Sequence, residues 1–278
     1  MKSAPSLSST RQVHFDHPVD DAVRQRILEQ LSELEQRHRV RVLFACESGS
    51  RAWGFASPDS DYDVRFIYVH EPSWYLSVDP QRDVIECPID DELDVSGWEL
   101  RKALSLLRRA NPVLLEWLSS PIVYRQDPDF IARLGHVVDR CFSPLRGRHH
   151  YLAMAKKNFR GYLQGETVRL KKYLYVLRPL LAARWIDSGR GVPPMRFADL
   201  AEAMLDDQAL LAEINRLLEI KMRSGEAEYA PRFERLHGFI RRELEVAATR
   251  EALSERPDGD QGLLDQLLYQ TVLRTQPC

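Results

Sequence analysis

The stretch Glu47-Ser-Gly-Ser-Arg-Ala-Trp-Gly-Phe-Ala-Ser-Pro-Asp-Ser-Asp-Tyr-Asp-Val-Arg-Phe-Ile-Tyr-Val69 decides the fold of this chain. A short apolar run ends at the small-residue turn formed by Gly49 and Ser50. After a second turn signal, residues 61–70 are rich in β-branched and aromatic side chains, which predicts a strand. Asp61 and Asp63 therefore stand one residue apart at the start of a predicted strand.

Side chains alternate between the two faces of a strand, so Asp61, Asp63 and Arg65 are expected on one face. Tyr62 and Val64 are expected to point into the core. Neighbouring carboxylates repel each other unless cations lie between them. Mg²⁺ prefers oxygen ligands and is usually held by one or two carboxylates together with substrate phosphates. The pair thus predicts two Mg²⁺ ions, with Mn²⁺ as an alternative, about 3.5–4 Å apart as in two-metal phosphoryl-transfer sites.

A third aspartate, Asp94, lies between the apolar residues Leu93 and Val95 in a later extended segment. Such flanks are typical of a strand residue, so we expect Asp94 to complete the metal site that activates an attacking hydroxyl. Asp90 and Asp91 compete for this role, but their run of acids is typical of a solvated turn. The candidate catalytic residues and metal ligands are Asp61, Asp63 and Asp94.

The turn before the strand predicts an anion site. Glycine lets the backbone approach a ligand closely, and successive N–H groups in such a turn form a concavity that binds anions. Ser50 adds a hydroxyl donor, and Arg51 follows it within reach of a phosphate. Gly49, Ser50 and Arg51 are therefore expected to hold the triphosphate of an NTP while a hydroxyl attacks its α-phosphorus and pyrophosphate leaves.

The pattern Gly49-Ser50-x₁₀-Asp61-x-Asp63, followed by a later strand aspartate, resembles the DNA polymerase β nucleotidyltransferase superfamily. The quoted stretch is most similar to the predicted nucleotidyltransferases associated with RNA repair, the RlaP type. The resemblance continues through residues 94–104, 111–118 and 171–182, and so covers about residues 40 to 200. It implies an enzyme that transfers an NMP from an NTP with two Mg²⁺ ions.

Charge is distributed unevenly along the chain. Residues 83–99 contain seven acids and no lysine or arginine, whereas residues 145–184 contain ten bases and one acid. The resemblance implies that a lysine on a downstream helix contacts the triphosphate, and Lys171 and Lys172 match that position. Tyr175 and Arg178 share a helical face with Lys171. The candidate nucleotide-binding residues are Gly49, Ser50, Arg51, Arg65, Lys171, Lys172, Tyr175 and Arg178.

Two aromatic residues after the turn, Trp53 and Phe55, allow two interpretations. Aromatic rings beside a phosphate-binding turn can stack on a nucleobase or cap the site. The same rings can instead pack in the core against a neighbouring helix. The sequence leaves both possibilities open.

Composition indicates an ordinary globular protein with 44% hydrophobic and 29% charged residues and a formal net charge of −2. The four cysteines are scattered and form no Cys-x-x-Cys pair, so neither a zinc site nor a disulfide framework is expected. No apolar run approaches the roughly 20 residues that span a bilayer, and the Ser-rich start does not resemble a signal peptide. We expect a cytoplasmic protein without membrane contact.

The pattern of elements predicts an α+β fold: a polymerase β-like catalytic domain with a short mixed sheet, followed by an all-helical domain. The expected boundaries are a flexible segment at 1–17, the catalytic domain at 18–126 and the helical domain at 127–278. Residues 84–95 are predicted as one extended segment that ends at Gly97, and a helix is predicted for 98–109. Pro179 is expected to kink a helix over 168–185 or to start a new one.

The sequence indicates the type of reaction more clearly than the molecule that carries the acceptor hydroxyl. An RNA 3′ end, such as that of a tRNA, is the first choice because of the resemblance and the basic helices. A hydroxyl on a partner protein is the second, as in antitoxin-like enzymes that adenylylate a partner, and a small molecule is the third. A non-catalytic nucleotide or RNA sensor is the alternative from another class. The preferred NTP and the oligomeric state are not indicated.

Overall fold

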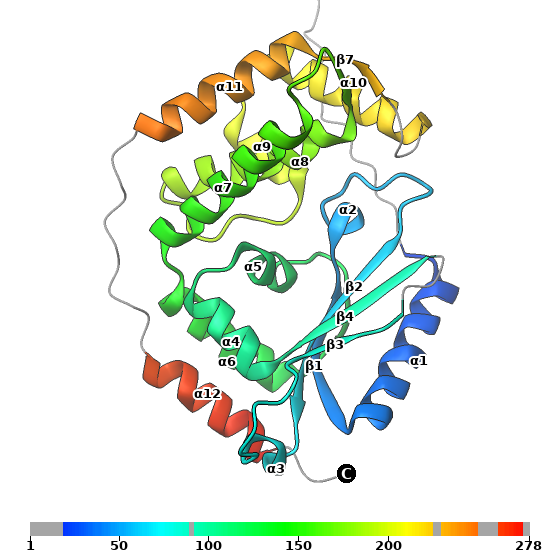
Figure 1. Ribbon diagram of the computed structural model, residues 1–278, viewed down its shortest axis with the longest axis vertical. Coiled ribbons are helices and arrows are strands. Elements are labelled where there is room, and N and C mark those ends of the chain that lie inside the picture. The colour runs from blue at the N-terminus through cyan, green and yellow to red at the C-terminus, as the bar shows by residue number, and fades with distance from the viewer. Residues whose placement is uncertain (1–18, 89–91, 225–228, 250–260, 275–278) are drawn as a thin grey trace, which may run out of the picture.

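The computed structural model describes residues 19–88, 92–224, 229–249 and 261–274 (Figure 1). The predicted flexible segment at 1–17 lies outside these residues, as do Asp90 and Asp91. The described part combines helices with a mixed sheet, which confirms the predicted α+β class.

A five-stranded sheet with strand order β3-β4-β2-β1-β5 forms the framework of the site. β2 and β4 are parallel, and the other neighbouring pairs are antiparallel. A parallel pair at the centre sets equivalent positions of β2 and β4 side by side. The strands are β1 (Val40–Glu47), β2 (Tyr62–His70), β3 (Val84–Glu86), β4 (Leu93–Glu99) and β5 (Val123–Gln126).

Alternation along β2 divides the core into two parts, as its sequence predicts. Val64, Phe66 and Tyr68 are buried on the face covered by helix α1 (Asp21–His38). Ile67 and Val69 belong to the core on the opposite face. That face is covered by α4 (Leu100–Arg108), α5 (Pro112–Leu118), α6 (Pro128–Cys141) and α12 (Gln261–Leu273), as Figure 1 shows.

The expectation of one extended segment over 84–95 is wrong, because β3 and β4 are two antiparallel strands. Gly97 does not end a strand but lies within β4. A Cβ atom there would come within 2.3 Å of the Phe66 ring, so a large buried neighbour requires the glycine. The helix predicted from residue 98 begins at Leu100, since the Glu99 side chain caps it by accepting from the Arg101 and Lys102 N–H groups.

Most of the remaining chain forms a helical half above the sheet in Figure 1. α8 continues through Pro179, so no new helix starts there. A small two-stranded antiparallel sheet of β6 (Thr167–Arg169) and β7 (Tyr229–Pro231) joins two loops of the helical half. The helices are α7 (Pro144–Tyr162), α8 (Lys171–Asp187), α9 (Phe197–Met204), α10 (Gln208–Ser224) and α11 (Glu234–Thr249).

α6 and α12 follow the predicted domain boundary at residue 126 but pack beside α4 near the sheet. One buried core runs from the sheet face that they cover into the helical half. No helix within the described residues is both long enough and apolar enough to cross a membrane.

Candidate active site

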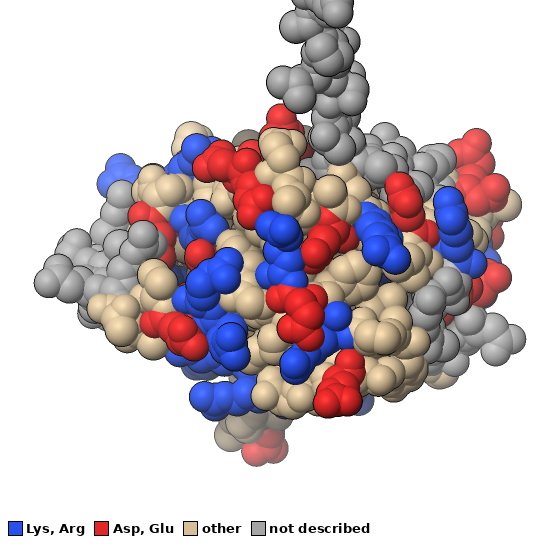
Figure 2. Space-filling view, turned by 90° about the horizontal axis from the view of Figure 1, so that it is seen from above, with Lys and Arg blue, Asp and Glu red and all other residues tan. Residues whose placement is uncertain are grey.

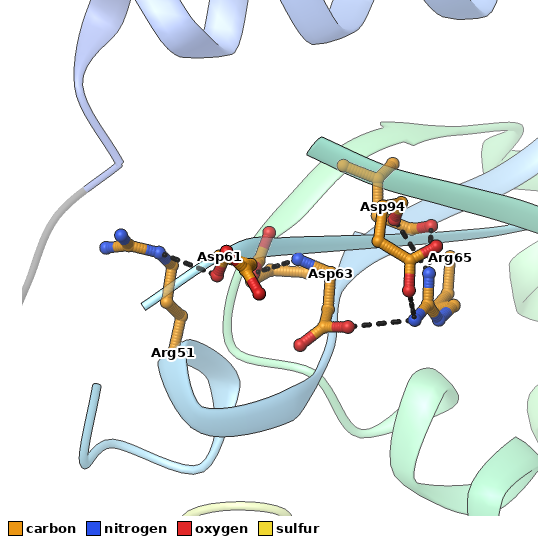
Figure 3. A network of polar contacts seen from close by, with 7 residues as sticks. Arg51, Asp61, Asp63, Arg65 and Asp94 are labelled. Atoms are coloured by element: carbon orange, nitrogen blue, oxygen red, sulfur yellow. Dashed lines mark hydrogen bonds and ion pairs between the residues drawn. The ribbon is translucent and has the colours of Figure 1, made fainter. Parts of the chain in front are cut away.

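Asp63 and Asp94 are direct partners in the register of the parallel strands β2 and β4. Arg65, two residues after Asp63, lies between them (Figure 3). Its Nη2 donates to Asp63 Oδ1 at 2.8 Å and to Asp94 Oδ2 at 2.7 Å, and its Nη1 donates to the Asp94 carbonyl at 2.7 Å. The structure therefore brings together three of the predicted site residues, with Asp94 on the neighbouring strand as expected.

Asp61 lies outside this ion-paired cluster. It stands one residue before β2 and is exposed. The predicted strand therefore starts one residue later than expected. In the part of the chain that the structure describes, no three His, Cys, Asp or Glu side chains form a group able to hold a metal ion. The carboxylates thus form an open arrangement on one sheet face rather than a closed cage.

This donor set fits a hard cation that shares its ligands with a substrate. Mg²⁺ needs only one or two protein carboxylates when phosphates supply further oxygens. Asp63 and Asp94 are adjacent and partly exposed, with side-chain exposures of 29% and 35%. The Arg65 guanidinium balances their charge, as a bound cation would. The residues present are therefore compatible with Mg²⁺.

The turn at Gly49 is built against Asp63. Gly49 begins the short helix α2 (Gly49–Ala52) with φ +58°, and a Cβ atom there would lie 2.0 Å from Asp63 Oδ2. The Ser48 N–H donates to the Asp63 carbonyl at 2.8 Å, which holds the turn on the strand. Only glycine suits this position, for both its backbone conformation and its space. Ser50 is buried beside this turn, with 5% of its surface exposed.

Glu47 is part of the site although no sequence pattern predicted a role for it. It is fully buried at the end of β1, and its Oε1 accepts the Asp63 N–H at 2.9 Å. The Tyr124 hydroxyl donates to its other oxygen. Burial raises the pKa of Glu47 to about 7, against the opposing effect of the Tyr124 hydrogen bond. The position of Glu47 directly before the Ser-Gly-Ser turn is the sequence feature that could have indicated this role.

Arg51 stabilises the loop that leads to Asp61. Its Nη2 and Nε donate to the carbonyls of Ser60 and Asp61 at 2.5 and 3.2 Å, respectively. Its guanidinium also lies over the Tyr62 ring, 3.8 Å from the ring centroid. Figure 3 shows Arg51 extending from α2 toward Asp61. In this structure Arg51 therefore fixes the backbone at the entry to β2.

Trp53 and Phe55 pack against the helical half, which is the second of the two interpretations. The Trp53 ring contacts Tyr175 edge-on with centroids 5.4 Å apart, and Phe55 meets Phe197 at 5.8 Å. The Trp53 carbonyl also accepts the Phe197 N–H at 2.9 Å. The loop after Gly49 is thus anchored on α8 and α9.

Arg178, predicted to bind nucleotide, lies in a buried ion pair. It is 2% exposed, and its Nη1 contacts Glu116 Oε1 of α5 at 2.6 Å. Its Nε donates to the Met195 carbonyl, and the guanidinium lies 4.7 Å from the Trp53 ring centroid. We assign Arg178 a structural role in joining α8 to α5 beside the sheet.

Lys171 and Lys172 both lie at the start of α8, close to Tyr175. Lys171 stands one turn before Tyr175, whose ring contacts Trp53. Lys172 is turned by about 100° from Lys171, yet its Nζ lies 4.9 Å from the centroid of the Tyr175 ring and 4.1 Å from that of the exposed Tyr162 ring. Both lysines therefore remain candidates for the triphosphate contact.

Lys221 is a second residue that sequence reasoning missed. It belongs to α10 and is 3% exposed, yet its Nζ donates to Ser57 Oγ at 3.3 Å. The Ser57 carbonyl accepts a hydrogen bond from the Ser60 N–H, and the Ser57 N–H donates to Ser60 Oγ, both at 3.0 Å. A helix far along the chain thus contacts the loop that carries Asp61. Nothing in the local pattern around Lys221 indicated this contact.

The predicted basic wall is not a uniform surface. Seen from above, the helical end of the molecule carries lysines and arginines interspersed with acids (Figure 2). Several of the ten predicted bases have specific protein partners, such as Asp187 for Arg148 and Glu116 for Arg178. The number of lysines and arginines in residues 145–184 therefore exceeds the net positive charge that this part of the chain presents to solvent.

The chain is similar to known proteins over most of its length. A curated relative, the uncharacterized protein YcgL of Bacillus subtilis (strain 168), is 46% identical over 252 residues, which cover 90% of this chain and 96% of that protein. A solved structure of a nucleotidyltransferase-like protein from Exiguobacterium sibiricum 255-15 aligns over 90% of this chain and 76% of that chain, at 14% identity and a TM-score of 0.31. Residues 23–270 match the model of the RNA repair pathway DNA polymerase beta family, RlaP, and the chain belongs to that family.

Proposed function

We propose that this protein is a Mg²⁺-dependent nucleotidyltransferase that moves an NMP from an NTP to the 3′ hydroxyl of an RNA and releases pyrophosphate. The observation that carries the proposal is the direct pairing of Asp63 and Asp94 beside the Gly49 turn. A pair of carboxylates next to a turn that tolerates no side chain suits a metal-bound triphosphate. Membership of the RNA repair family supports the choice of RNA as acceptor.

Asp63, Asp94 and Asp61 would hold the metal ions. When bound, Mg²⁺ lowers the pKa of the acceptor hydroxyl and offsets the negative charge of the phosphates. The protein itself would position the carboxylates that hold the metal ions. Glu47 fixes the backbone of Asp63, and Gly49 leaves room beside the Asp63 carboxylate. Preorganised groups of this kind need little rearrangement when the substrate binds.

The cationic residues of the site would neutralise the triphosphate. Arg65 is bound to both carboxylates in this structure, and it would be available to phosphate oxygens if those carboxylates held a metal ion instead. Lys171 and Lys172 lie at the start of α8, near Tyr175, whose ring contacts Trp53 directly after α2. A guanidinium and an ammonium that both contact the triphosphate would hold its α-phosphorus in position for attack.

The proposal is tested with each α-³²P-labelled NTP in turn, together with Mg²⁺, total RNA and a protein lysate. We expect label in RNA with one preferred NTP, and none with the Asp63→Asn or Asp94→Asn proteins. Both substitutions keep side-chain size and remove the charge that a metal needs. The Asp139→Asn protein is the matched control, because Asp139 is an exposed aspartate on α6 and lies outside the site.

Other outcomes contradict the proposal in different ways. Label in a protein band would replace RNA with a protein hydroxyl as the acceptor. Wild-type turnover by the Asp63→Asn protein would show that the carboxylates are not the metal ligands. NTP binding without any transfer to RNA, protein or a small molecule would favour a sensor.

A further inference from the structure

A concave site lies beyond the far end of β4 from Asp94. It is a groove of about 620 Å³ between α4 and the segment that links α3 (Pro72–Tyr75) to β3. This volume lies within the range of small-ligand sites, roughly 300–1,000 Å³. Side chains that matter for its chemistry are Trp74, Tyr75, Asp83, Arg101, Lys102 and Arg109.

The α4 wall of this groove is positively charged. The helix carries bases and no acid between Leu100 and Arg108, and Arg109 follows directly. Among the described residues, neither Arg101 nor Arg109 forms an ion pair, and both are exposed. Two exposed guanidiniums on one wall, with Ser105 between them in the sequence, favour a ligand with more than one phosphate group.

The acidic residues near this wall are largely neutralised. Lys102 Nζ contacts Asp83 Oδ1 at 2.9 Å. Glu99 is 1% exposed and accepts hydrogen bonds from the Tyr75 hydroxyl and the Arg101 N–H. Burial raises the pKa of Glu99, against the opposing effect of the Tyr75 hydrogen bond. Asp79, in the opposite wall, is the remaining exposed carboxylate of the lining.

Aromatic rings form the end of the groove. Trp74 and Tyr75 are both partly exposed and line it. Trp74 is stacked on His70 with centroids 4.3 Å apart, and Arg101 lies 5.1 Å from the Tyr75 ring centroid. Rigid aromatic rings beside guanidinium groups are typical of sites that bind single-stranded nucleic acid, where bases stack and cations follow the backbone.

We propose that this groove binds a single-stranded segment of the RNA whose 3′ end reaches Asp63 and Asp94; this inference rests on the proposed function. α4 packs on the sheet face that also carries the two aspartates. Asp94 and Glu99 are five residues apart on β4, a separation of about 16 Å at 3.3 Å per residue. A few nucleotides of extended strand span that distance, so one RNA can occupy both places.

The test measures binding of a fluorescein-labelled 12-nucleotide single-stranded RNA by anisotropy over a range of salt concentrations. The Arg101→Ala/Arg109→Ala double variant is expected to bind at least tenfold more weakly. Its salt slope should be smaller by about 1.4, since each phosphate contact on a single strand contributes about 0.7. Arg241→Ala is the matched control, because Arg241 is an exposed arginine on α11.

A variant that should bind RNA more tightly distinguishes a specific effect on RNA binding from a loss of folding. Asp79→Asn removes the remaining exposed acid of the groove and should tighten RNA binding two- to fivefold. Unchanged affinity in both the double variant and the Asp79→Asn protein would overturn the proposal. Complete displacement of the RNA by 1 mM AMP would also overturn it, because the groove would then be a mononucleotide site.

Failure of this inference is distinguishable from failure of the proposed function. Labelled NMP transfer to RNA with unaltered binding by the groove variants would refute the groove alone. Groove-dependent RNA binding without transfer by the wild-type protein would refute the proposed reaction, and with it the part of the inference that brings the 3′ end to Asp63. Binding of labelled ATP to the double variant should equal that of the wild type.

Discussion

Asp63 and Asp94 face each other across the parallel strands β2 and β4, and one guanidinium nitrogen of Arg65 bonds to both. Without Arg65, two carboxylates would lie together on one sheet face with no opposite charge between them. The arginine thus performs in this structure the electrostatic task that the proposed function gives to Mg²⁺.

Replacing Arg65 should make the stability of the protein depend on Mg²⁺. In the Arg65→Ala protein the paired carboxylates repel each other in the presence of EDTA, and a cation relieves that repulsion. We expect the melting temperature of this variant to rise by about 2 °C on adding 5 mM Mg²⁺, corresponding to about 1 kcal/mol. The wild-type protein should shift less. Equal shifts in both proteins, measured by differential scanning fluorimetry, would argue against metal binding between these residues.

Gly49→Ala should abolish transfer through crowding of Asp63. The new methyl group would lie 2.0 Å from Asp63 Oδ2, and the φ of +58° adds strain of about 1–2 kcal/mol. Gly54→Ala is the matched control, since Gly54 also has a positive φ, +83°, but a methyl group there would meet nothing within 4 Å. Both variants should lose stability in urea, Gly49→Ala the more because of its clash with Asp63, while only Gly49→Ala loses at least 100-fold in kcat. Comparable activity in the two would show that Gly49 acts through backbone conformation alone.

Lys221→Met should slow the reaction without weakening NTP binding. Methionine keeps the length of the buried side chain but cannot donate to Ser57 Oγ, so the loop that carries Asp61 loses its contact with α10. We expect kcat to fall about tenfold with little change in KM, as for a residue that positions another. Arg223→Met, an exposed position two residues later in α10, should leave both constants unchanged. A rise in KM for NTP alone would instead indicate direct contact between Lys221 and the triphosphate.

Local patterns predicted the parts of the site that depend on one element. Alternation along β2 correctly placed Asp63 and Arg65 on one face and Val64 in the core. The apolar flanks of Asp94 correctly predicted a strand. These features follow from the two-residue period of a strand, which is visible in the sequence alone.

Contacts between distant segments escaped prediction because no local pattern encodes them. In the sequence, Gly97 resembles the end of a strand. In the structure it lies inside β4, because the large ring of Phe66 on the neighbouring strand β2 leaves no room for a side chain. Arg178 and Lys171 share one helical face, yet only Arg178 meets the buried carboxylate of Glu116. Their different surroundings arise from the docking of α8 on α5, which depends on tertiary packing.

His70 should make the folded state sensitive to acid. Burial, and to a lesser extent the positive charge of His38, lowers the pKa of His70 from 6.5 to about 4. Its ring is stacked on Trp74 with centroids 4.3 Å apart and meets Tyr68 edge-on at 5.4 Å. Protonation therefore favours the unfolded chain, so this contribution to stability is complete above pH 6.5 and is lost as the pH falls toward 4.

The expected loss is on the order of 1–2 kcal/mol, after allowance for the partial exposure of the ring. Urea unfolding of the wild type and of His70→Gln at pH 7 and pH 4.5 measures it. Although His70→Gln loses the stacked ring and is less stable at pH 7, its stability should fall less between the two pH values. His150→Gln, an exposed histidine on α7, should behave as the wild type. An equal pH dependence in all three proteins would place the acid-sensitive group elsewhere, since His70 would then titrate alike in the folded and unfolded chains.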